Sequence, residues 1–394
     1  MPSTVADRQL VGGDFKVYLS PQTAKGAINA SPVFQAFRRT SGRAKKTVNY
    51  TQSAEVSLDF NAVRQIQDTS EIMAEVETEA TKQTMNMLIS ALHGTEVVTA
   101  QTATTISTTA SGLSASSGTP FATINVGDFI FVTGFANPLL NRTYLVTAKA
   151  SSTAITTSPA PAAVVAAGAS VTVKSNRTIN ANTPTYYTGQ NRVIDNSAAG
   201  LTDYYTPYDG IINSQSVAIG ETGILTSTVS MMYERDSVNN ALISGQTDSA
   251  ELTDAPLSAV QNIANWYFGG SSALCVLKSA TININNNYQK DDAAGCVSRY
   301  GRGQFDVIVE GVSRSSIADS MNVRDLYYAG TRTAFGVEFD HGGGDKTVIY
   351  IPQCVLTAWD MEDGQNVISN DSFSLAAEKS SSLAYTIAVF RNWQ

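Results

Sequence analysis

The sequence offers few residues from which a catalytic or metal-binding site could be assembled. It contains two histidines, His93 and His341, and three cysteines, Cys275, Cys296 and Cys354. Structural zinc sites usually need Cys or His ligands in closely spaced pairs, and no two of these cysteines form a CxxC pair. A sparse, odd number of cysteines is typical of free thiols in a protein made in a reducing cytoplasm. We therefore expect no metal site and no cofactor.

Sequence motifs of common enzymes are also missing. The chain has no Gly-x-Ser-x-Gly elbow, no P-loop and no Gly-rich dinucleotide motif between a strand and a helix. Asp345 follows the glycine-rich turn 341–344 and could bind a cation, but this pattern is more typical of a hairpin turn. Carboxylates are plentiful, yet spacing alone places no pair across a cleft. We predict that the protein is not an enzyme.

Acidic residues recur at alternate positions in two short segments. They are Glu75, Glu77 and Glu79 in the first segment, and Asp306 and Glu310 in the second. Because successive side chains of a β-strand point to opposite faces, each set lines one face of its strand. Such a face could line a channel through which DNA passes without sticking, since carboxylates repel phosphate. The alternative is the solvated outer face of an ordinary sheet.

Basic residues gather just upstream of the first acidic segment. Nucleic-acid contact is one interpretation, but the formal net charge of −8 argues against tight nonspecific binding of nucleic acid. Few aromatic residues interleave with the cluster, unlike in single-strand binding platforms. We favour contact with an acidic rim of another copy, and plain solvation is the alternative. The cluster consists of Arg38, Arg39, Arg43, Lys45 and Lys46.

Length and composition indicate a multidomain globular protein. With 394 residues, of which 43% are hydrophobic, the chain can form two or three domains with sizeable cores. Charged residues make up only 15% of the chain, which suits a β protein whose surface is partly covered by partners. The sequence has no evident signal peptide and no apolar run long enough to cross a membrane.

The hydrophobic periodicity predicts mostly strands, with two helices. Period-two alternation indicates strands, among others, at 33–39, 54–60, 73–79, 273–285 and 305–310. Apolar residues at helical spacing predict a helix capped by Thr81 and ended by Gly94. A second helix should begin at Ser316 and run to about Ala329. We expect polar loops at 61–71 and 286–304, and a linker at 235–255.

The order of these elements occurs twice along the chain. Tyr205–Ser214 and Tyr350–Trp359 both place an aromatic residue two positions before a proline, and both follow a turn-rich stretch. The Thr/Ser/Ala-rich segment and the strands that follow it interrupt only the first copy. We therefore predict a discontinuous first domain, 1–94 and 179–245, an inserted β domain, 95–178, and a second domain, 256–394.

In its order of elements the chain resembles the tail tube proteins of long-tailed, siphovirus-like bacteriophages. The resemblance covers nearly the whole chain. Asp128–Gly134 resembles the start of an immunoglobulin-like decoration domain that is inserted in some such proteins. The segments that carry the resemblance to the tube proteins are Arg38–Gly42, 61–71, 72–94, Asp254–Ala259, Gly269–Ser272, Val276–Asn287, 305–329 and Tyr350–Pro352.

The resemblance implies two tube domains, each a β-sandwich or barrel with a flanking helix. In the family, subunits form six-domain rings that stack into a tube, so a duplicated chain would need three copies for each ring. It further implies a virion tail protein that is assembled in the host cytoplasm and contacts itself and the terminator, tape-measure and distal tail proteins. Double-stranded DNA would pass through the tube during ejection, with no insertion of the protein into a membrane.

Two other readings remain open from the sequence. A virion-associated β adhesin or carbohydrate-binding protein would expose aromatic platforms and would not assemble with itself. A β-rich depolymerase would need a pair of carboxylates in a groove. The aromatic residues Trp266, Tyr267, Tyr327, Tyr328 and Trp359 are more typical of core or interface anchors than of sugar platforms.

Overall fold

The computed structural model describes most of the chain. Within the described residues the protein is mainly β, with two helices, which confirms the fold class expected from the alternating patterns. The expected strand 54–60 lies outside the described residues. The described ranges are 15–52, 65–103, 105–167, 170–194, 202–238, 242–250, 252–269, 271–272, 277–292, 299–314, 317–362 and 369–393.

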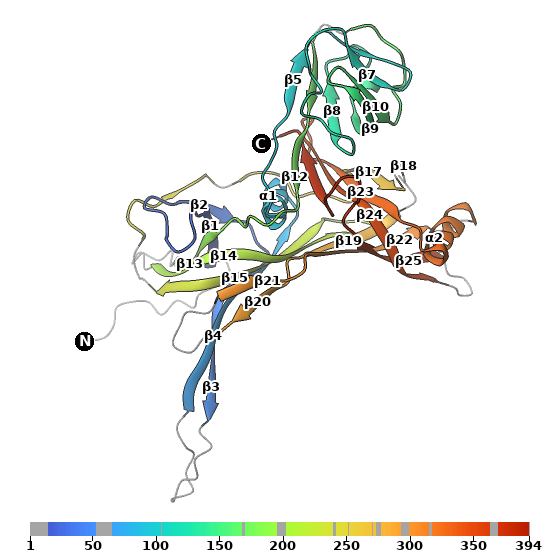
Figure 1. The fold of residues 1–394 in the computed structure, drawn as a ribbon. Helices are drawn as coiled ribbons and strands as arrows, with labels where there is room; N and C mark the ends of the chain where they lie inside the picture. The colour runs from blue at the N-terminus through green and yellow to red at the C-terminus, as the bar shows by residue number, and fades with distance from the viewer. Residues whose placement is uncertain are drawn as a thin grey trace, which may run out of the picture.

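One antiparallel sheet runs across the middle of the molecule (Figure 1). We call it the continuous sheet, because eight strands follow one another in it without a break. In spatial order they are β3 (Ser41–Gln52), β4 (Gln65–Glu79), β15 (Thr226–Val238), β14 (Thr202–Ile219), β19 (Leu277–Asn285), β22 (Asp306–Arg314), β25 (Asn370–Ala377) and β24 (Lys346–Met361).

The same order of pairing occurs in both halves of the continuous sheet. β3, β4, β15 and β14 are followed by β13 (Tyr187–Ile194), β1 (Phe15–Pro21) and β2 (Val33–Phe37). β19, β22, β25 and β24 are followed by β23 (Thr333–Asp340), β17 (Ile263–Phe268) and β18 (Ser271–Ser272). In each half a helix follows the second strand: α1 (Lys82–Ala91) after β4, and α2 (Ile317–Ala329) after β22.

Irregularities in register show which positions of the two halves correspond. β14 shifts against β15 between Ile212 and Ser214, and β24 shifts against β25 between Leu356 and Ala358. Ser214 therefore corresponds to Ala358. The sequence comparison had set Ser214 against Trp359, so it was one residue out of step. The reason is that it aligned two prolines, whereas the hydrogen-bonded register does not place those prolines at equivalent positions.

The hydrophobic core lies on one side of the continuous sheet. Val217, Ile282 and Val309 point into one buried cluster that extends over both halves and includes Leu88 and Leu92 of the α1 segment. Helix α1 begins after Thr81, whose side chain and that of Thr84 form a capping box. The predicted N-cap and apolar spacing of this helix are thus confirmed, and α2 also lies where the sequence predicted a helix.

A second sheet, drawn at the top of Figure 1, is built only from residues 100–174. It has a hydrophobic cluster of its own, around Phe121, Tyr144 and Val171. The Thr/Ser/Ala-rich run 95–117, for which no strand was expected, supplies three of its strands. In spatial order the strands are β5 (Ala100–Ala103), β11 (Val171–Lys174), β8 (Phe129–Thr133), β9 (Thr143–Ser151), β10 (Ala154–Ser158), β7 (Gly112–Ala115) and β6 (Ile106–Thr108).

This second sheet packs tightly on the second half of the chain. The Phe129 ring contacts the rings of Tyr267, Tyr350 and Phe390 at centroid distances of 5.0, 5.0 and 5.5 Å. The buried carboxylate of Glu338 accepts hydrogen bonds from the Thr143 and Tyr267 hydroxyls. Strand β12 (Asn176–Ile179) continues the contact by pairing with β26 (Ala388–Arg391), which pairs with β24.

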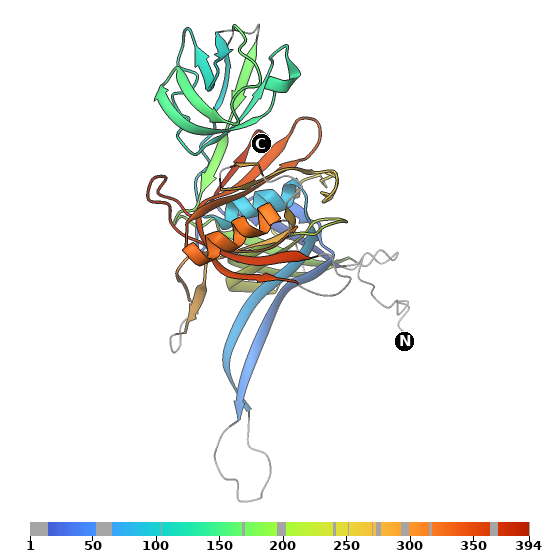
Figure 2. The same cartoon turned by 90° about the vertical axis from the view of Figure 1, so that its right-hand side faces the viewer.

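Two hairpins extend away from the side that carries the second sheet (Figures 1 and 2). The longer one is formed by β3 and β4, and the shorter by β20 (Tyr288–Asp291) and β21 (Arg299–Arg302). The predicted loops 61–71 and 286–304 are therefore wrong in part, because both contain hairpin strands. The expected linker 235–255 likewise contains the end of β15 and β16 (Thr247–Asp248), which pairs parallel with β2.

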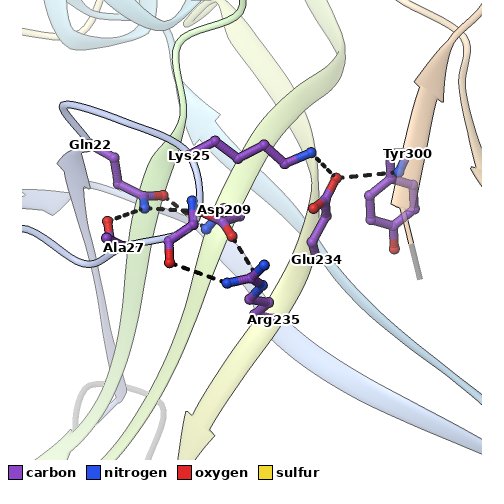
Figure 3. A network of polar contacts seen from close by, with 8 residues as sticks. Gln22, Lys25, Ala27, Asp209, Glu234, Arg235 and Tyr300 are labelled. Carbon is purple, nitrogen blue, oxygen red and sulfur yellow. Dashed lines mark hydrogen bonds and ion pairs between the residues drawn. The ribbon is translucent and has the colours of Figure 1, made fainter. Parts of the chain in front are cut away.

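A polar network fastens the base of these hairpins to the first half (Figure 3). The Asp209 carboxylate, which is fully buried, accepts hydrogen bonds from the Gln22 side chain and the Gly26 N–H at 3.1 and 2.7 Å. Glu234 of β15 pairs with Lys25 and accepts a hydrogen bond from the Tyr300 N–H of β21. The loop after β1 and the shorter hairpin are thus held on the same pair of strands.

Neither of the two helices is long and apolar enough, within the described residues, to cross a membrane.

Candidate functional site

The five alternating acids lie on one face of the continuous sheet. Residues that pair directly across antiparallel strands point to the same face. The pairing carries the face of Glu79 through Thr226, Ala218 and Thr281 to Glu310. Neighbouring rows begin at Glu77 and Glu75, and the row of Glu75 ends at Asp306. The sequence predicted an acidic face for each strand, and the structure places both sets on the same one.

This acidic face lies opposite the hydrophobic core. On β4 the residues between the glutamates, Ala74, Val76 and Thr78, are buried, whereas Glu75 and Glu77 are exposed and Glu79 is half-buried. We define the acidic face by the residues of three rows over β4, β15, β14, β19, β22 and β25, none of which is buried. They are Glu75, Glu77, Glu79, Ser214, Ser216, Ala218, Thr226, Thr228, Ser230, Thr281, Asn283, Asn285, Asp306, Ile308, Glu310, Ser374 and Ala376.

The acidic face combines carboxylates with small hydroxyl and amide side chains. Lys and Arg do not occur in the three rows; basic residues border them at Arg43 and Lys45 on β3 and at Arg314 at the end of β22. The Glu77 carboxylate accepts a hydrogen bond from the Ser41 hydroxyl at 2.8 Å. A surface of this kind repels a polyanion and offers it no cationic anchor.

The continuous sheet ends in two exposed edge strands, β3 and β24. Among the described strands, β3 pairs only with β4, and the C-terminal half of β24 pairs only with β25. Along β3 the side chains of Arg43 and Lys45 are exposed, and along β24 those of Ala358 and Asp360 are exposed. Open edges of this length template pairing with another strand, so they define the second part of the candidate site.

The basic cluster is divided by the fold instead of forming one patch. The Arg38 and Arg39 guanidinium groups donate to the backbone carbonyls of Asp254 and Phe15. These residues bind their own chain. The remaining three lie on β3, where Arg43 and Lys45 point to the side of the acidic face.

The third of these β3 residues, Lys46, points to the opposite side of the strand. Its ammonium group pairs with Asp236 at 3.0 Å.

The histidines and Asp345 have structural environments. Burial, with a smaller contribution from Arg302, lowers the pKa of His93 to about 4. Burial and the nearby Lys82 lower the pKa of His341 to about 4. The Asp345 carboxylate pairs with Lys82 at 2.7 Å. In the part of the chain that the structure describes, no three His, Cys, Asp or Glu side chains are grouped to hold a metal ion.

Sequence reasoning missed the edge strands and the acids on one of them. Asp360 lies within β24 and Glu362 directly follows it, and both are exposed. Alternation of Asp360 and Glu362 is the same signal that located the other acids, but it sits at the end of a longer apolar strand. Strand β3 was missed because only one of its residues, Ala44, is buried.

Comparison with known proteins adds a family assignment to this geometry. A family model described as phage tail tube protein matches residues 3–378, which is nearly the whole chain. No curated protein matches the sequence.

Proposed function

We propose that this chain, which belongs to the family of phage tail tube proteins, is the major tail tube subunit of a siphovirus-like phage and polymerises into stacked rings. The rings form the channel through which the genome is ejected into the host cell, and the acidic face lines that channel. The observation that carries the proposal is the continuous sheet, which has an acidic face opposite its core and an open edge strand at each end.

Ring closure would remove the aggregation hazard of the two open edges. A sheet that closes on itself has no edge left to pair wrongly. Each half of the chain supplies four strands in the same order, so we take the halves as two tube domains, 1–94 with 179–245 and 256–394. Six such domains require three chains, which gives a homotrimeric ring with pseudo-sixfold symmetry.

The inserted domain, 95–178, occurs once in each chain, so it would decorate the ring with threefold symmetry. We infer an immunoglobulin-like role in surface decoration from its β architecture. Its close packing on the second half, through Phe129 and Glu338, favours a fixed projection over a loosely tethered one.

Stacking of rings would use the two hairpins that extend from one side of the molecule. Their tips lie far from the second sheet (Figure 2), where they can reach a neighbouring ring along the tube axis. The basic cluster at the base of the longer hairpin, from Arg38 to Lys46, is our candidate for contacts between rings. The terminator, tape-measure and distal tail proteins would meet the ends or the lumen of the tube, and the tube would be assembled in the host cytoplasm before it becomes part of the virion.

The family match favours this function over an adhesin or carbohydrate-binding protein, the alternative from the sequence. The family is structural and not enzymatic, in agreement with the prediction that the chain is not an enzyme. Electron microscopy of the purified protein separates the two functions. We expect rings or tubes with a central channel, and a protein that stays monomeric at high concentration would contradict the proposal.

Reversal of charge on the acidic face tests its role in the channel. Changing Glu75, Glu77 and Glu79 to Lys should leave tubes intact in electron micrographs, because these side chains point away from the core. Tubes of the variant should retain double-stranded DNA, whereas wild-type tubes should not, because each added Lys can replace a DNA counterion. Phage carrying the variant should eject DNA poorly.

A control variant, Asp325→Lys, reverses charge on the exposed side of α2 and should leave DNA delivery unchanged. Collapse of assembly in the triple variant would place the glutamates in an interface and refute the channel assignment.

A further inference from the structure

The two open edges of the continuous sheet carry opposite charge. On the side of the acidic face, β3 presents Arg43 and Lys45, and β24 presents Asp360, followed by Glu362. All four side chains are exposed. No ion pair joins any of them to another described residue; the Arg43 guanidinium lies over the Phe15 ring instead, 5.2 Å from its centroid.

The junction between the two halves provides a template for joining two chains. There β14, the last strand of the first half, pairs with β19, the first strand of the second half. The register places Ser216 opposite Asn283 and Ala218 opposite Thr281. The strands that correspond to β14 and β19 at the outer ends of the sheet are β24 and β3.

Positions can be transferred from the template because the halves share their irregularities. The register shifts make Ser216 equivalent to Asp360, and Ala218 to Glu362. On the other strand, Ser41 pairs with Glu77 as Ser279 pairs with Val312, which makes Lys45 equivalent to Asn283. The starts of α1 at Lys82 and of α2 at Ile317 give the same correspondence of β4 with β22.

We propose that β24 of one chain pairs antiparallel with β3 of a second copy, in the register that sets Asp360 opposite Lys45 and Glu362 opposite Arg43. This inference rests on the ring proposed above and specifies how that ring closes. It assigns Arg43 and Lys45 to contacts within a ring instead of between rings. Opposite charges directly across a strand pair stabilise that register, and a slip by one residue would move them to opposite faces.

The backbone hydrogen bonds of both edges agree with this register. The Asn191 side-chain amide accepts from the Ala44 N–H and donates to the Ala44 carbonyl, so these two groups point away from β4. On the other edge the Glu362 N–H donates to the Asn370 carbonyl, so Glu362 points toward β25 and Met361 points away from it. The register sets Ala44 opposite Met361, two residues whose backbone groups both point outward, as a hydrogen-bonded pair requires.

Side chains of the same chain now hold the places that a partner strand would take. The Asn191 amide presents one donor and one acceptor to Ala44, as a backbone peptide does. The Asp360 carboxylate accepts a hydrogen bond from the Met361 N–H at 2.9 Å. Ring closure would exchange both contacts for strand pairing and would release Asp360 to meet Lys45 of the second copy.

A disulfide across the predicted pair tests the register. Lys45 and Asp360 would form a non-hydrogen-bonded pair, whose Cα atoms lie about 4.5 Å apart, within the range that a disulfide spans. Under oxidising conditions the Lys45→Cys/Asp360→Cys variant should give covalent dimers and trimers on a denaturing gel. The matched variant Lys46→Cys/Asp360→Cys directs the two thiols to opposite faces and should give none, like wild type and the single variants.

The outcomes separate this inference from the proposed function. Rings that form without a cross-link, or that cross-link equally in the matched variant, would overturn the register and leave the tube function standing. Absence of rings in wild type would overturn the tube function itself.

Charge exchange gives a second, independent test. Lys45→Glu and Asp360→Lys should each raise the protein concentration needed for half-assembly by about tenfold, because each places like charges opposite one another. The double variant restores opposite charges and should assemble within about twofold of wild type. Two single effects that add up in the double variant would show that the two residues do not meet.

Discussion

Replacing Phe129 by Ala should uncouple the second sheet from the body of the protein. Phe129 is fully buried, and its ring contacts three aromatic rings that all belong to the second half of the chain. Its neighbours Ile130 and Val132 face the core of their own sheet instead. The substitution therefore removes contacts between the two parts and leaves the core of the second sheet intact.

The magnitude follows from the size of the lost side chain. Truncation of a buried Phe to Ala costs about 3–5 kcal/mol, and aromatic pairs contribute about 0.5–1.5 kcal/mol each beyond area burial. With three rings lost at once, we expect the free energy of unfolding to fall by about 4 kcal/mol. Urea denaturation measures this value, provided that the protein is kept below its assembly concentration.

A matched variant separates docking from general loss of stability. Phe121→Ala removes a fully buried ring from the core of the second sheet itself and should destabilise that sheet without freeing it. Small-angle X-ray scattering at neutral pH should show a larger radius of gyration for Phe129→Ala only. A loss below about 1 kcal/mol, or equal scattering from both variants, would refute the reasoning that this aromatic contact fixes the second sheet.

Two further predictions concern buried ionisable groups. The folded His93 and His341 have pKa values of about 4, so below pH 6.5 the unfolded chain binds more protons than the folded one. Lowering the pH from 7 to 5 should therefore cost about 2 kcal/mol per histidine in urea denaturation. His93→Gln should lose its share of this dependence, and an unchanged slope would contradict the burial argument. Asp209→Asn keeps a residue that tolerates the positive φ of 58° but weakens the contacts of its carboxylate. It should lower the free energy of unfolding by about 1–3 kcal/mol and speed proteolysis of the loop 22–29, whereas wild-type cleavage rates would argue against the network.

Local patterns predicted the elements that bury one face. Strands β4 and β22 alternate between core and acidic face, and α1 has its apolar residues at helical spacing, so both signals were read correctly. Strand β3 lacks such a signal because only Ala44 is buried in it. The segments 65–71 and 288–302 project from the body as hairpin strands, so they too lack an apolar period.

Contacts between distant segments could not be predicted from the sequence. Pairing of β14 with β19 joins the two halves into one sheet, yet each strand alone indicates only that it is a strand. The contact of Phe129 with Tyr267 likewise links the segment 95–178 to the second half, although it interrupts the first. The shift between Ile212 and Ser214 displaced the sequence comparison by one residue, because a bulge adds a residue without changing the local composition.

The most direct test of the account is the number of chains in one ring. Cryo-electron microscopy of tubes assembled from the purified protein measures it from the symmetry of a cross-section. The account predicts three chains for each ring, a lumen surrounded by six similar β units, and three outer projections formed by residues 95–178. Six chains around the lumen, or projections at six positions, would contradict it.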